Sequence, residues 1–461
     1  METTILWWKK DYRGQLIALR MQGELRYKKG GNMKRLSRIA LFCGSVLIQL
    51  TCTPGNSKES NGPLFCRGIN MERFLWGQTG GARSYTREKL KSYWPAWDGQ
   101  KVAIPEHRIE SLKAMKFDHV RLFVHPVPLL QETEDMRERL LNEVFGVVRH
   151  LQSDGFSVVL TFAFGEIDES DLKERIETSS QDADTFMSLL TKTARRLAST
   201  EVIKKRTALE FSNEPETGCN IKATERWENV QHKFYEQVRV VAPALPLILT
   251  GDCWSGLEGL LRLDPTPYRS DINALFTVHF YEPRLVTAQG VSWRNNDYQY
   301  FDQIPFPFTI DDLPGMRARL RANIERAFGS NSEQSERTYE RLDKWLVDFA
   351  KDHWDRNRIR ARALTLSNWA KSHGISPSRI YIGEFGTFWS GGKGTGITRT
   401  ARINWLSAVN SEFAALGMGR AIWADISVGS FGILKENDEP DNELTDALVE
   451  GDSPNCRANI H

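Results

Sequence analysis

Two glutamates near the ends of apolar runs are the residues of this sequence best suited to chemistry. In LEFSNEPETG, residues 209–218, the apolar run stops at Asn213 and Glu214, which would be poor choices for packing a core. A second run, RIYIGEF (379–385), carries Glu384 near its end. Two carboxylates across a sugar-sized cleft can cleave a glycosidic bond, because one protonates the leaving oxygen and the other attacks the anomeric carbon. The alternative is that each glutamate pairs with a neighbouring cation at the surface.

Polar and aromatic side chains near the ends of other apolar runs would share this cleft. Asn213 can hydrogen-bond the 2-hydroxyl of a sugar. Arg121 and Tyr281 can donate to Glu384 and keep it ionised as a nucleophile. Glu214 has no such cation beside it and lies close to the charge of the nucleophile, so we expect a raised pKa and a bound proton. The remaining candidates for sugar contacts are His125, Trp254, His279 and Trp423.

Eight short apolar runs would carry these side chains. Most are uniformly apolar, which is typical of strands buried on both faces. Between them, apolar residues recur at spacings of three and four, as over 136–151 and 400–417, which predicts helices. Eight strand-then-helix units predict an α/β fold, a (β/α)8 TIM barrel with its chemistry at the carboxyl ends of the strands. The predicted strands are 64–71, 119–125, 157–164, 207–213, 246–251, 274–281, 379–385 and 420–426.

The connection between strands six and seven, residues 282–378, is longer than the others. It opens with Pro and aromatic residues and continues as strongly charged helical patterns over 315–374. Because strands seven and eight are still needed to close the barrel, we interpret the region as an enlarged loop-helix insertion and not as a second domain. We therefore expect one catalytic domain over 61–452 and a C-terminal tail over 453–461.

The first 60 residues read as a leader. Basic residues follow Met33, and an apolar stretch over 39–50 precedes a polar tract, which is the layout of a secretory signal peptide. Because such a peptide must start near the N-terminus, we interpret 1–32 as a spurious N-terminal extension upstream of the true start. Residues 33–60 are then a signal peptide and a polar linker.

This leader predicts export, to the periplasm or the extracellular space. An N-terminal anchor with a cytoplasmic lead is the alternative. Lipid anchoring at Cys52 is left open, because Thr51 is bulkier than the usual small residue before a lipidated cysteine. Four of the six cysteines follow the leader without metal-type spacing; one disulfide can form after export, and its pairing cannot be read from the sequence.

Composition and histidine spacing argue against nucleic-acid and membrane partners and against a metal-dependent enzyme. Lys plus Arg total 61 against 59 for Asp plus Glu, and a net charge of +2 gives no reason to expect nucleic acid or an acidic membrane. His125 and His279 are isolated and no H-x-H pair occurs, which argues against a metal-dependent hydrolase. We expect a monomer with no cofactor and no metal, and no membrane contact apart from the leader.

Several segments resemble the signatures of glycoside hydrolase family 5, the cellulase family, in its exported bacterial members. The resemblance runs from about residue 64 to residue 433 and keeps the motifs in order. The matching segments are GINM (68–71), HVRLFV (119–124), SNEPE (212–216), VHFYEP (278–283), YEPRLVTAQGVSW (281–293), IGEFGTF (382–388) and AIWADI (421–426).

The resemblance implies a retaining double displacement in which Glu214 matches the acid/base and Glu384 the nucleophile. It also implies roles for four supporting residues and an aromatic platform under the sugar, which are Arg121, Asn213, His279, Tyr281 and Trp423. One feature departs from the family: its members commonly carry a His near the end of strand three, where this chain has FAF at 162–164. Glu166 could replace that His, or be a solvated loop charge.

The first hypothesis is an exported hydrolase, a retaining β-glycosidase that cleaves a β-linked glucan in the manner of an endoglucanase or cellulase, and so serves polysaccharide catabolism. Within the same class, a β-mannanase or an exopolysaccharide-specific β-glycosidase is the alternative, because sugar choice depends on loops. From another class, a catalytically silent carbohydrate-binding barrel would have lost one of the two glutamates, and both are present.

Overall fold

The computed structural model divides the chain into two compact units, Met1–Glu59 and Ser60–His461. The residues it describes are 6–10, 16–20, 65–75, 104–164, 170–178, 180–199, 207–216, 218–292, 296–389, 396–423, 431–435 and 439–449. In the first unit, strands β1 (Leu6–Lys10) and β2 (Leu16–Arg20) pair antiparallel. The expected signal peptide at 33–60, including Cys52, lies outside the described residues.

The second unit is built on a closed barrel of eight parallel strands, in the order β10-β3-β4-β5-β6-β7-β8-β9. The predicted (β/α)8 barrel is therefore confirmed. Strand boundaries differ from prediction by up to four residues: β3 begins and ends later than expected, and β6 and β10 end earlier. The strands are β3 (Arg67–Leu75), β4 (His119–Val124), β5 (Ser157–Phe162), β6 (Thr207–Glu210), β7 (Leu247–Thr250), β8 (Ala274–Phe280), β9 (Ile380–Phe385) and β10 (Gly419–Ile422).

Side chains alternate along these strands between two apolar layers. On β4, Val120, Leu122 and Val124 belong to the large core between the barrel and its helices. A smaller cluster fills the barrel interior, and it consists of Phe65, Val159, Ala208, Ile248, Tyr381 and Ala421. Interior side chains from alternate strands stack in layers in such barrels. The small cluster therefore forms an apolar floor, above which the polar side chains of the mouth can be fixed.

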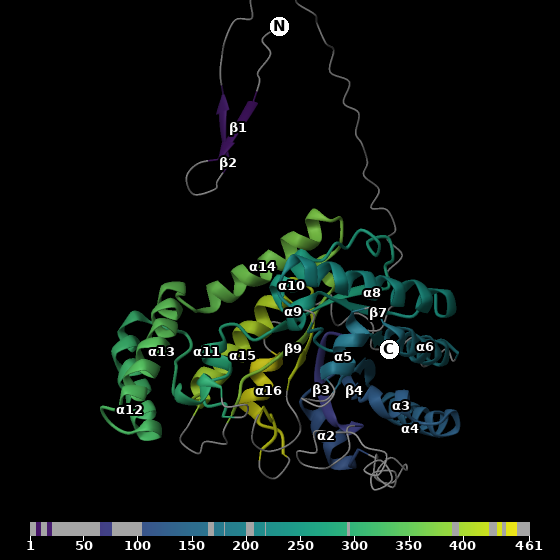
Figure 1. The fold of residues 1–461 in the computed structure, drawn as a ribbon, viewed down its shortest axis with the longest axis horizontal. Helices are drawn as coiled ribbons and strands as arrows, with labels where there is room; N and C mark the ends of the chain where they lie inside the picture. The colour runs from purple at the N-terminus through teal and green to yellow at the C-terminus, as the bar shows by residue number, and fades with distance from the viewer. Residues whose placement is uncertain are drawn as a thin grey trace, which may run out of the picture. The chain divides into compact units, whose positions relative to one another are not determined.

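Helices surround the barrel (Figure 1). The predicted helices at 136–151 and 400–417 correspond to α4 and α15, and Gly417, at φ +73°, follows the end of α15. The helices outside the long connection are α2 (Glu106–Ala114), α3 (Pro126–Gln131), α4 (Glu134–Ser153), α5 (Ser170–Glu177), α6 (Gln181–Ala198), α8 (Ile221–Val241), α9 (Asp252–Ser255), α10 (Leu257–Arg262), α15 (Arg399–Ala414) and α16 (Asn442–Val449).

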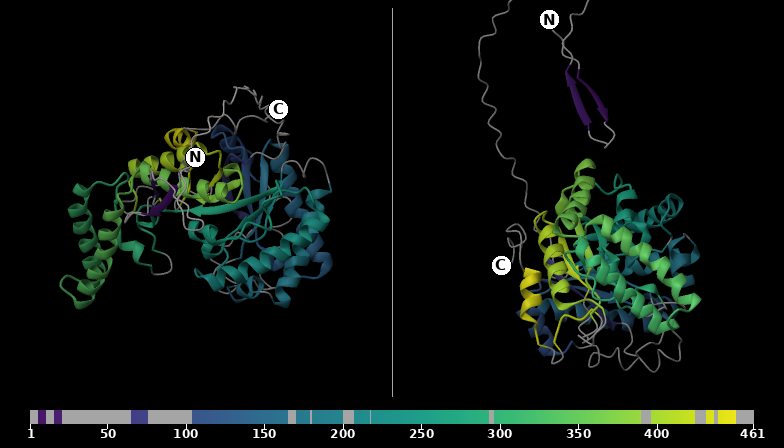
Figure 2. Two further views of the ribbon diagram at one scale, coloured as in Figure 1. Left: turned by 90° about the horizontal axis from the view of Figure 1, so that it is seen from above. Right: turned by 90° about the vertical axis from the view of Figure 1, so that its left-hand side faces the viewer.

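The connection between β8 and β9 contains three long helices, α12 (Leu313–Phe328), α13 (Glu333–Asp352) and α14 (Arg356–Ser372). Shorter helical turns accompany them, namely α11 (Arg284–Thr287), η3 (Asp297–Tyr300), η4 (Ile310–Asp312) and η5 (Pro377–Arg379). Helices α12 and α13 lie side by side at one edge of this unit (Figure 2). No helix in the described ranges is both long and apolar enough to cross a membrane.

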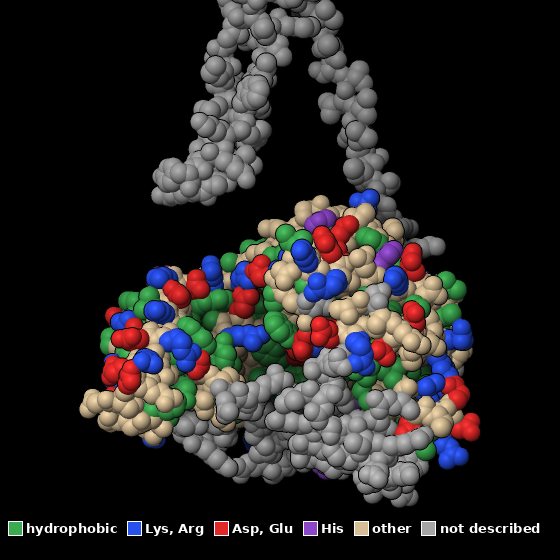
Figure 3. Space-filling view, viewed as in Figure 1, with side chains coloured by type: hydrophobic (Ala, Val, Ile, Leu, Met, Phe, Trp, Pro, Cys, Tyr) green, Lys and Arg blue, Asp and Glu red, His purple; other side chains and the backbone are tan. Residues whose placement is uncertain are grey.

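Helices α12 and α13 pack through an apolar seam with ion pairs at its border. Leu320 and Leu342 are buried in this seam. Arg317 donates to Asp343 at 2.7 and 2.8 Å. Charges of both signs are interspersed over these helices (Figure 3). Because exposed ion pairs contribute only about 0–1 kcal/mol each, the apolar seam accounts for most of the packing energy.

Candidate active site

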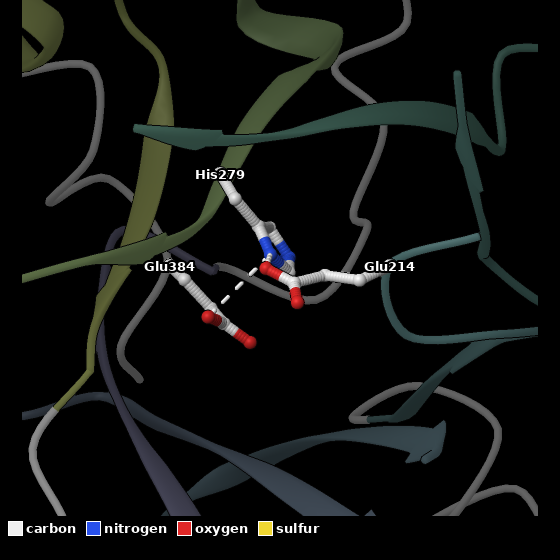
Figure 4. A group of neighbouring side chains, drawn as sticks. All are labelled: Glu214, His279 and Glu384. Carbon is white, nitrogen blue, oxygen red and sulfur yellow. Dashed lines mark hydrogen bonds and ion pairs between the residues drawn. The ribbon is translucent and has the colours of Figure 1, made fainter. Parts of the chain in front are cut away.

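Glu214, His279 and Glu384 come together at the mouth of the barrel, where their side chains point toward one another (Figure 4). Nδ1 of His279 lies 2.8 Å from Oε1 of Glu214 and 3.4 Å from Oε2 of Glu384. One oxygen of each carboxylate and one ring nitrogen of His279 all lie within 4.8 Å of one another. A single bond of a bound ligand could therefore contact both carboxylates.

An extra residue in β9 directs Glu384 into the barrel. Strands β8 and β9 pair in register up to Val278 and Ile382. The next pair joins His279 to Glu384, so Gly383 is an extra residue in β9. Because side chains alternate along a strand, Glu384 would otherwise point outward like Ile382, and the bulge returns it to the interior. Glycine is required at the bulge, since a Cβ there would lie 2.5 Å from a side-chain oxygen of β8.

Two donors fix the carboxylate of Glu384, as the sequence led us to expect. Nη1 of Arg121 donates to Oε1 at 3.0 Å, and the hydroxyl of Tyr281 donates to Oε2 at 2.9 Å. The side chain of Glu384 is only 5% exposed. Charge-assisted hydrogen bonds of this kind are short and strong. Both oxygens of Glu384 are thus held in place before any ligand arrives.

Arg121 is fully buried and binds two further acceptors that sequence analysis missed. Nε and Nη2 donate to the two carboxylate oxygens of Glu210 at 2.7 and 2.9 Å, and Nη1 donates to Oδ1 of Asn70 at 2.8 Å. Burial alone would lower the pKa of Arg121, but Glu210 and then Glu384 raise it. The signal for Glu210 was present in the sequence, because a carboxylate within a strand buried on both faces requires a buried cation.

Glu214 lies four residues beyond the end of β6, not on the strand as expected, with its φ at +48° in the left-handed region. Its Oε1 is bonded to Nδ1 of His279. The other ring nitrogen, Nε2, lies 3.4 Å from Nη2 of Arg121, which can only donate. This contact favours the tautomer in which Nδ1 of His279 carries the hydrogen and donates to Glu214.

The expectation that Glu214 has a raised pKa is wrong for this structure. Burial raises the pKa of Glu214, but the hydrogen bond and charge of His279, with smaller contributions from Lys173 and Arg121, bring it below its usual value. Burial, together with the negative charge of Glu214, raises the pKa of Glu384 instead. The sequence argument gave Glu214 no polar partner and so overlooked His279.

The amide of Asn213 is oriented by the same arginine. Its Oδ1 accepts from Nη2 of Arg121 at 2.8 Å, and its backbone N–H donates to the carbonyl of Phe162 at 2.8 Å. Its Nδ2 has no partner among the residues that the structure describes. Because the oxygen is committed to Arg121, the amide nitrogen is the end of Asn213 that remains available to a ligand hydroxyl.

Comparison with known proteins assigns the chain to a family. The cellulase family, described as glycosyl hydrolase family 5, matches residues 84–424. The chain belongs to glycoside hydrolase family 5. The resemblance noted in the sequence is therefore confirmed.

Individual relatives of this family 5 chain are distant. Endoglucanase 3 of Fibrobacter succinogenes is 24% identical over 272 residues, which cover 58% of this chain and 37% of that protein. This chain thus spans little more than a third of that relative. Cel5A of Thermotoga maritima, solved with cellobiose, has a TM-score of 0.56 at 19% identity, covering 84% of this chain and 98% of that chain. Cellulose synthase subunit Z of Clostridioides difficile has a TM-score of 0.56 at 18% identity, covering 84% and 100%. These two structures show the shared fold.

Trp423 of this family 5 barrel lies directly after β10, beside the strand that carries Glu384. Its backbone N–H donates to the carbonyl of Phe385 at 2.6 Å, and its ring meets Phe123 edge-on at a centroid distance of 5.2 Å. The ring is half-buried. It is therefore held rigidly near Glu384, where an aromatic platform was expected.

Trp254 lies on the other side, next to the Glu214 loop. It is 43% exposed, and it is the middle of three consecutive residues in the left-handed region, with φ of 57°, 55° and 53° at Cys253, Trp254 and Ser255. Its backbone N–H donates to the carbonyl of Pro215 at 3.0 Å. This unusual backbone presents the indole beside the loop that carries Glu214.

A disulfide joins the two loops at this point. Cys219, which follows the Glu214 loop, is bonded to Cys253, and the two Cα atoms lie 4.6 Å apart. The sequence left the pairing of the cysteines open and allowed for one disulfide. Cys66 is disulfide-bonded as well. The Cys219–Cys253 bond ties the β7 loop, and with it Trp254, to the loop of Glu214.

His125 has a different place from the other sequence candidates. It is buried at the N-cap of α3, where its Nδ1 accepts the backbone N–H of Val127 at 3.3 Å. A capping side chain satisfies one of the free N–H groups at the start of a helix. This ring nitrogen therefore serves the fold, and His125 is outside the group formed by Glu214, His279 and Glu384.

The departure at strand three has a packing reason. Phe162 and Phe164 both contact Phe186 of α6, at centroid distances of 5.6 and 5.8 Å. They thus belong to the core between barrel and helix and not to the mouth of the barrel. Glu166, the candidate replacement for the family histidine, lies outside the described residues.

The trio of Glu214, His279 and Glu384 is also the described group whose spacing would suit a metal ion. Arg121 sits 3.0 Å from Glu384 and already supplies a positive charge to that carboxylate. A divalent cation placed between the carboxylates would be repelled by this buried guanidinium. The arrangement therefore suits two carboxylates acting on a ligand better than it suits a resident metal.

Proposed function

We propose that this family 5 chain is a retaining β-glycosidase that cleaves a β-linked glucan. The observation that supports a retaining reaction is the spacing of Glu214 and Glu384, which have one oxygen each within 4.8 Å of the other. Carboxyl groups of retaining enzymes lie about 5–5.5 Å apart, whereas inverting enzymes need about 6.5–9.5 Å to admit a water molecule.

In the first step, the carboxylate of Glu384 attacks the anomeric carbon while Glu214 gives its proton to the glycosidic oxygen. The bond to the leaving sugar breaks and an ester to Glu384 forms. In the second step, Glu214 takes a proton from water, which attacks the same carbon and releases Glu384. Arg121 and Tyr281 hold the attacking carboxylate, and the amide nitrogen of Asn213 can donate to the sugar 2-hydroxyl.

This sequence of steps needs a proton on Glu214 and a charge on Glu384, the reverse of what the pKa shifts favour. The side chain of Glu214 is 30% exposed, whereas that of Glu384 is already 5% exposed. A bound sugar would therefore exclude water mainly from Glu214. Because burial is the largest influence that raises its pKa, substrate binding would move the proton toward the acid/base.

The sugar is proposed from the named relatives and from the aromatic side chains. One relative is an endoglucanase, and Cel5A of Thermotoga maritima is solved with cellobiose. Indole rings such as those of Trp423 and Trp254 present flat apolar faces on which sugar rings can stack. Cel5A is also solved with mannotriose, which supports a β-mannan as the second candidate. The likeness to a cellulose synthase subunit supports a bacterial exopolysaccharide as the third.

Export of the protein belongs to the same proposal. The sequence after Met33 has the layout of a signal peptide. The Cys219–Cys253 disulfide supports this, because disulfides persist in the periplasm and outside the cell and are rare in the reducing cytosol.

The test compares the full chain with Glu384→Ala and Glu214→Ala on β-glucans, mannan, bacterial cellulose and aryl β-glycosides. We expect wild type to release sugar of retained anomeric configuration, observed by proton NMR at early times. Azide should restore activity to both variants. Glu384→Ala should then give the α-glycosyl azide and Glu214→Ala the β-glycosyl azide.

Three results would contradict the proposal. An inverted first product would exclude the retaining reaction. Azide products of the opposite configurations would exchange the two roles. Binding of a glycan by calorimetry without cleavage of any substrate would favour the silent carbohydrate-binding barrel.

A further inference from the structure

Helix α5 places two buried charged side chains against the loop that carries Glu214. Lys173 and Glu177 are four residues apart on this helix and so share one face. Their side chains are 9% and 0% exposed, respectively. Burying an ammonium and a carboxylate costs free energy unless both are well paired, so the groups that pair them are informative.

Lys173 bonds to the backbone of the catalytic loop itself. Its Nζ donates to the carbonyl oxygen of Glu214 at 2.7 Å and to Oε1 of Glu216 at 3.0 Å. Glu214 has a positive φ and precedes Pro215, a combination that a non-glycine residue adopts only at a conformational cost. The ammonium therefore holds the peptide group that follows a strained residue.

Glu177 bonds to the same loop on either side of Glu214. Its Oε2 accepts the backbone N–H of Glu216 at 2.8 Å, and its Oε1 accepts the hydroxyl of Ser212 at 3.3 Å. Together the two side chains of α5 bind residues before, at and after Glu214. On the opposite side of the loop, the backbone N–H of Trp254 bonds to Pro215.

We propose that Lys173 and Glu177 are positioning residues that hold the backbone of Glu214 in the orientation its acid/base role requires. The proposal rests on the proposed function, and it extends that function to a helix that touches neither carboxylate of the catalytic pair. Strained residues persist only where the surroundings over-determine them. The bonds from α5 supply that constraint.

The test uses leaving groups that differ in their need for a proton. 2,4-Dinitrophenolate leaves from an aryl glycoside without protonation, whereas phenolate needs the acid. We would measure kcat/KM, which reports the first step, for 2,4-dinitrophenyl and phenyl β-cellobiosides, or for the β-mannobiosides if wild type prefers mannan. The full-length variants are Lys173→Met, Lys173→Arg and Glu177→Gln, with Glu214→Ala as the reference for complete loss of the acid.

We expect Lys173→Met to lose at least about tenfold in kcat/KM on the phenyl glycoside, because general acid catalysis contributes about 10²–10⁴-fold. Its loss on the dinitrophenyl glycoside should be within about threefold, since no proton is needed. Glu177→Gln should show the same pattern more weakly, because the amide oxygen still accepts one bond. Lys173→Arg should recover part of the loss. The matched controls Glu174→Gln, exposed on the same helix, and Lys222→Met, exposed on α8, should resemble wild type on both substrates.

Equal losses on the two substrates would overturn the proposal, since a merely structural role lowers both alike. Wild-type values in both Lys173→Met and Glu177→Gln would also overturn it. If Lys173→Met does not fold, by circular dichroism and thermal melting, the isosteric Glu177→Gln decides the matter alone. If Glu214→Ala itself shows no dependence on the leaving group, the proposed function fails, a result distinct from failure of the positioning role.

Discussion

Arg121 and Glu210 form a two-pronged ion pair inside the barrel, with N–O distances of 2.7 and 2.9 Å and no exposed surface on either side chain. Removing one partner of a buried pair leaves an uncompensated charge, which costs about 3–5 kcal/mol. We expect Glu210→Gln to lower the free energy of unfolding by an amount of this order and to lower activity, because Arg121 also holds Glu384. Urea unfolding and kcat measure the two effects. Glu225→Gln, exposed on α8, is the control, and an unchanged stability of Glu210→Gln would contradict the argument.

Tyr281→Phe removes the hydroxyl that donates to Oε2 of Glu384. A hydrogen bond to a charged group contributes about 1.5–3 kcal/mol, so kcat/KM should fall by about ten- to a hundredfold. The bond also lowers the pKa of Glu384. Its loss should therefore raise that pKa further. Because Glu384 already has the higher pKa of the pair in the free enzyme, the basic limb of the kcat/KM profile should move to higher pH. Tyr298→Phe, on η3, should leave the profile unchanged, and a shift to lower pH in Tyr281→Phe would refute the assignment.

His279→Gln should move the whole pH profile of kcat/KM upward. His279 lowers the pKa of Glu214 through its hydrogen bond and charge, and it lowers the pKa of Glu384 through its charge. Without it both pKa values rise, so the acidic limb, set in the free enzyme by the lower pKa of Glu214, and the basic limb, set by the higher pKa of Glu384, both lie at higher pH. Initial rates from pH 4 to 9 measure this. His232→Gln, on the surface of α8, is the control, and an acidic limb that stays in place would show that Glu214 does not set it.

Burial raises the pKa of Glu177 from an ordinary 4.5 to about 7. The native state therefore binds this proton more tightly than the unfolded state does. The resulting stability is complete below pH 4.5 and is lost as the pH rises through 7, by about 3 kcal/mol in all. Glu177→Gln carries no such proton. We expect the unfolding free energy of wild type to fall relative to this variant between pH 4.5 and 8, while Glu174→Gln follows wild type. A constant difference between wild type and Glu177→Gln would disprove the shift.

Replacing both Cys219 and Cys253 by Ala should lower the free energy of unfolding by about 3–4 kcal/mol, the loop-closure value for their sequence separation of 34. KM should rise as well, because the β7 loop is no longer tied to the Glu214 loop. Trp254→Ala separates the two effects, since it removes the indole and keeps the disulfide. It should raise KM with little change in stability. An unchanged KM in both variants would remove Trp254 from the binding site.

The barrel was readable from the sequence, and Glu214 and Glu384 could be picked out as candidates, because their signals are local. Apolar runs of strand length ended in Glu214 and Glu384, and helical spacing lay between them. Arg121 and Tyr281 were assigned to Glu384 by their places at strand ends, and the structure shows both bonds. In each case a few neighbouring residues carried the pattern.

The features of the site that could not be predicted from the sequence depend on strand register and on contacts between residues distant in the chain. The bulge at Gly383 changes which face Glu384 occupies, and nothing in RIYIGEF marks it. His279 lies 65 residues from Glu214, and its bond reversed the expected pKa shift. Lys173 and Glu177 lie on a short charged helix that looks solvated in the sequence. Their burial follows only from how α5 packs against the catalytic loop.

Closure of the barrel has a consequence for how this chain is made. Strand β3 begins at Arg67, but one of its two neighbours, β10, begins only at Gly419, and Arg67 pairs with Arg420. During synthesis, β3 and β9 therefore each keep one unpaired edge until β10 has been made. Open strand edges recruit other strands, and such distant pairings form slowly. A chain that ends between β9 and β10 would have a seven-stranded sheet with two open edges, and open edges of this kind favour aggregation.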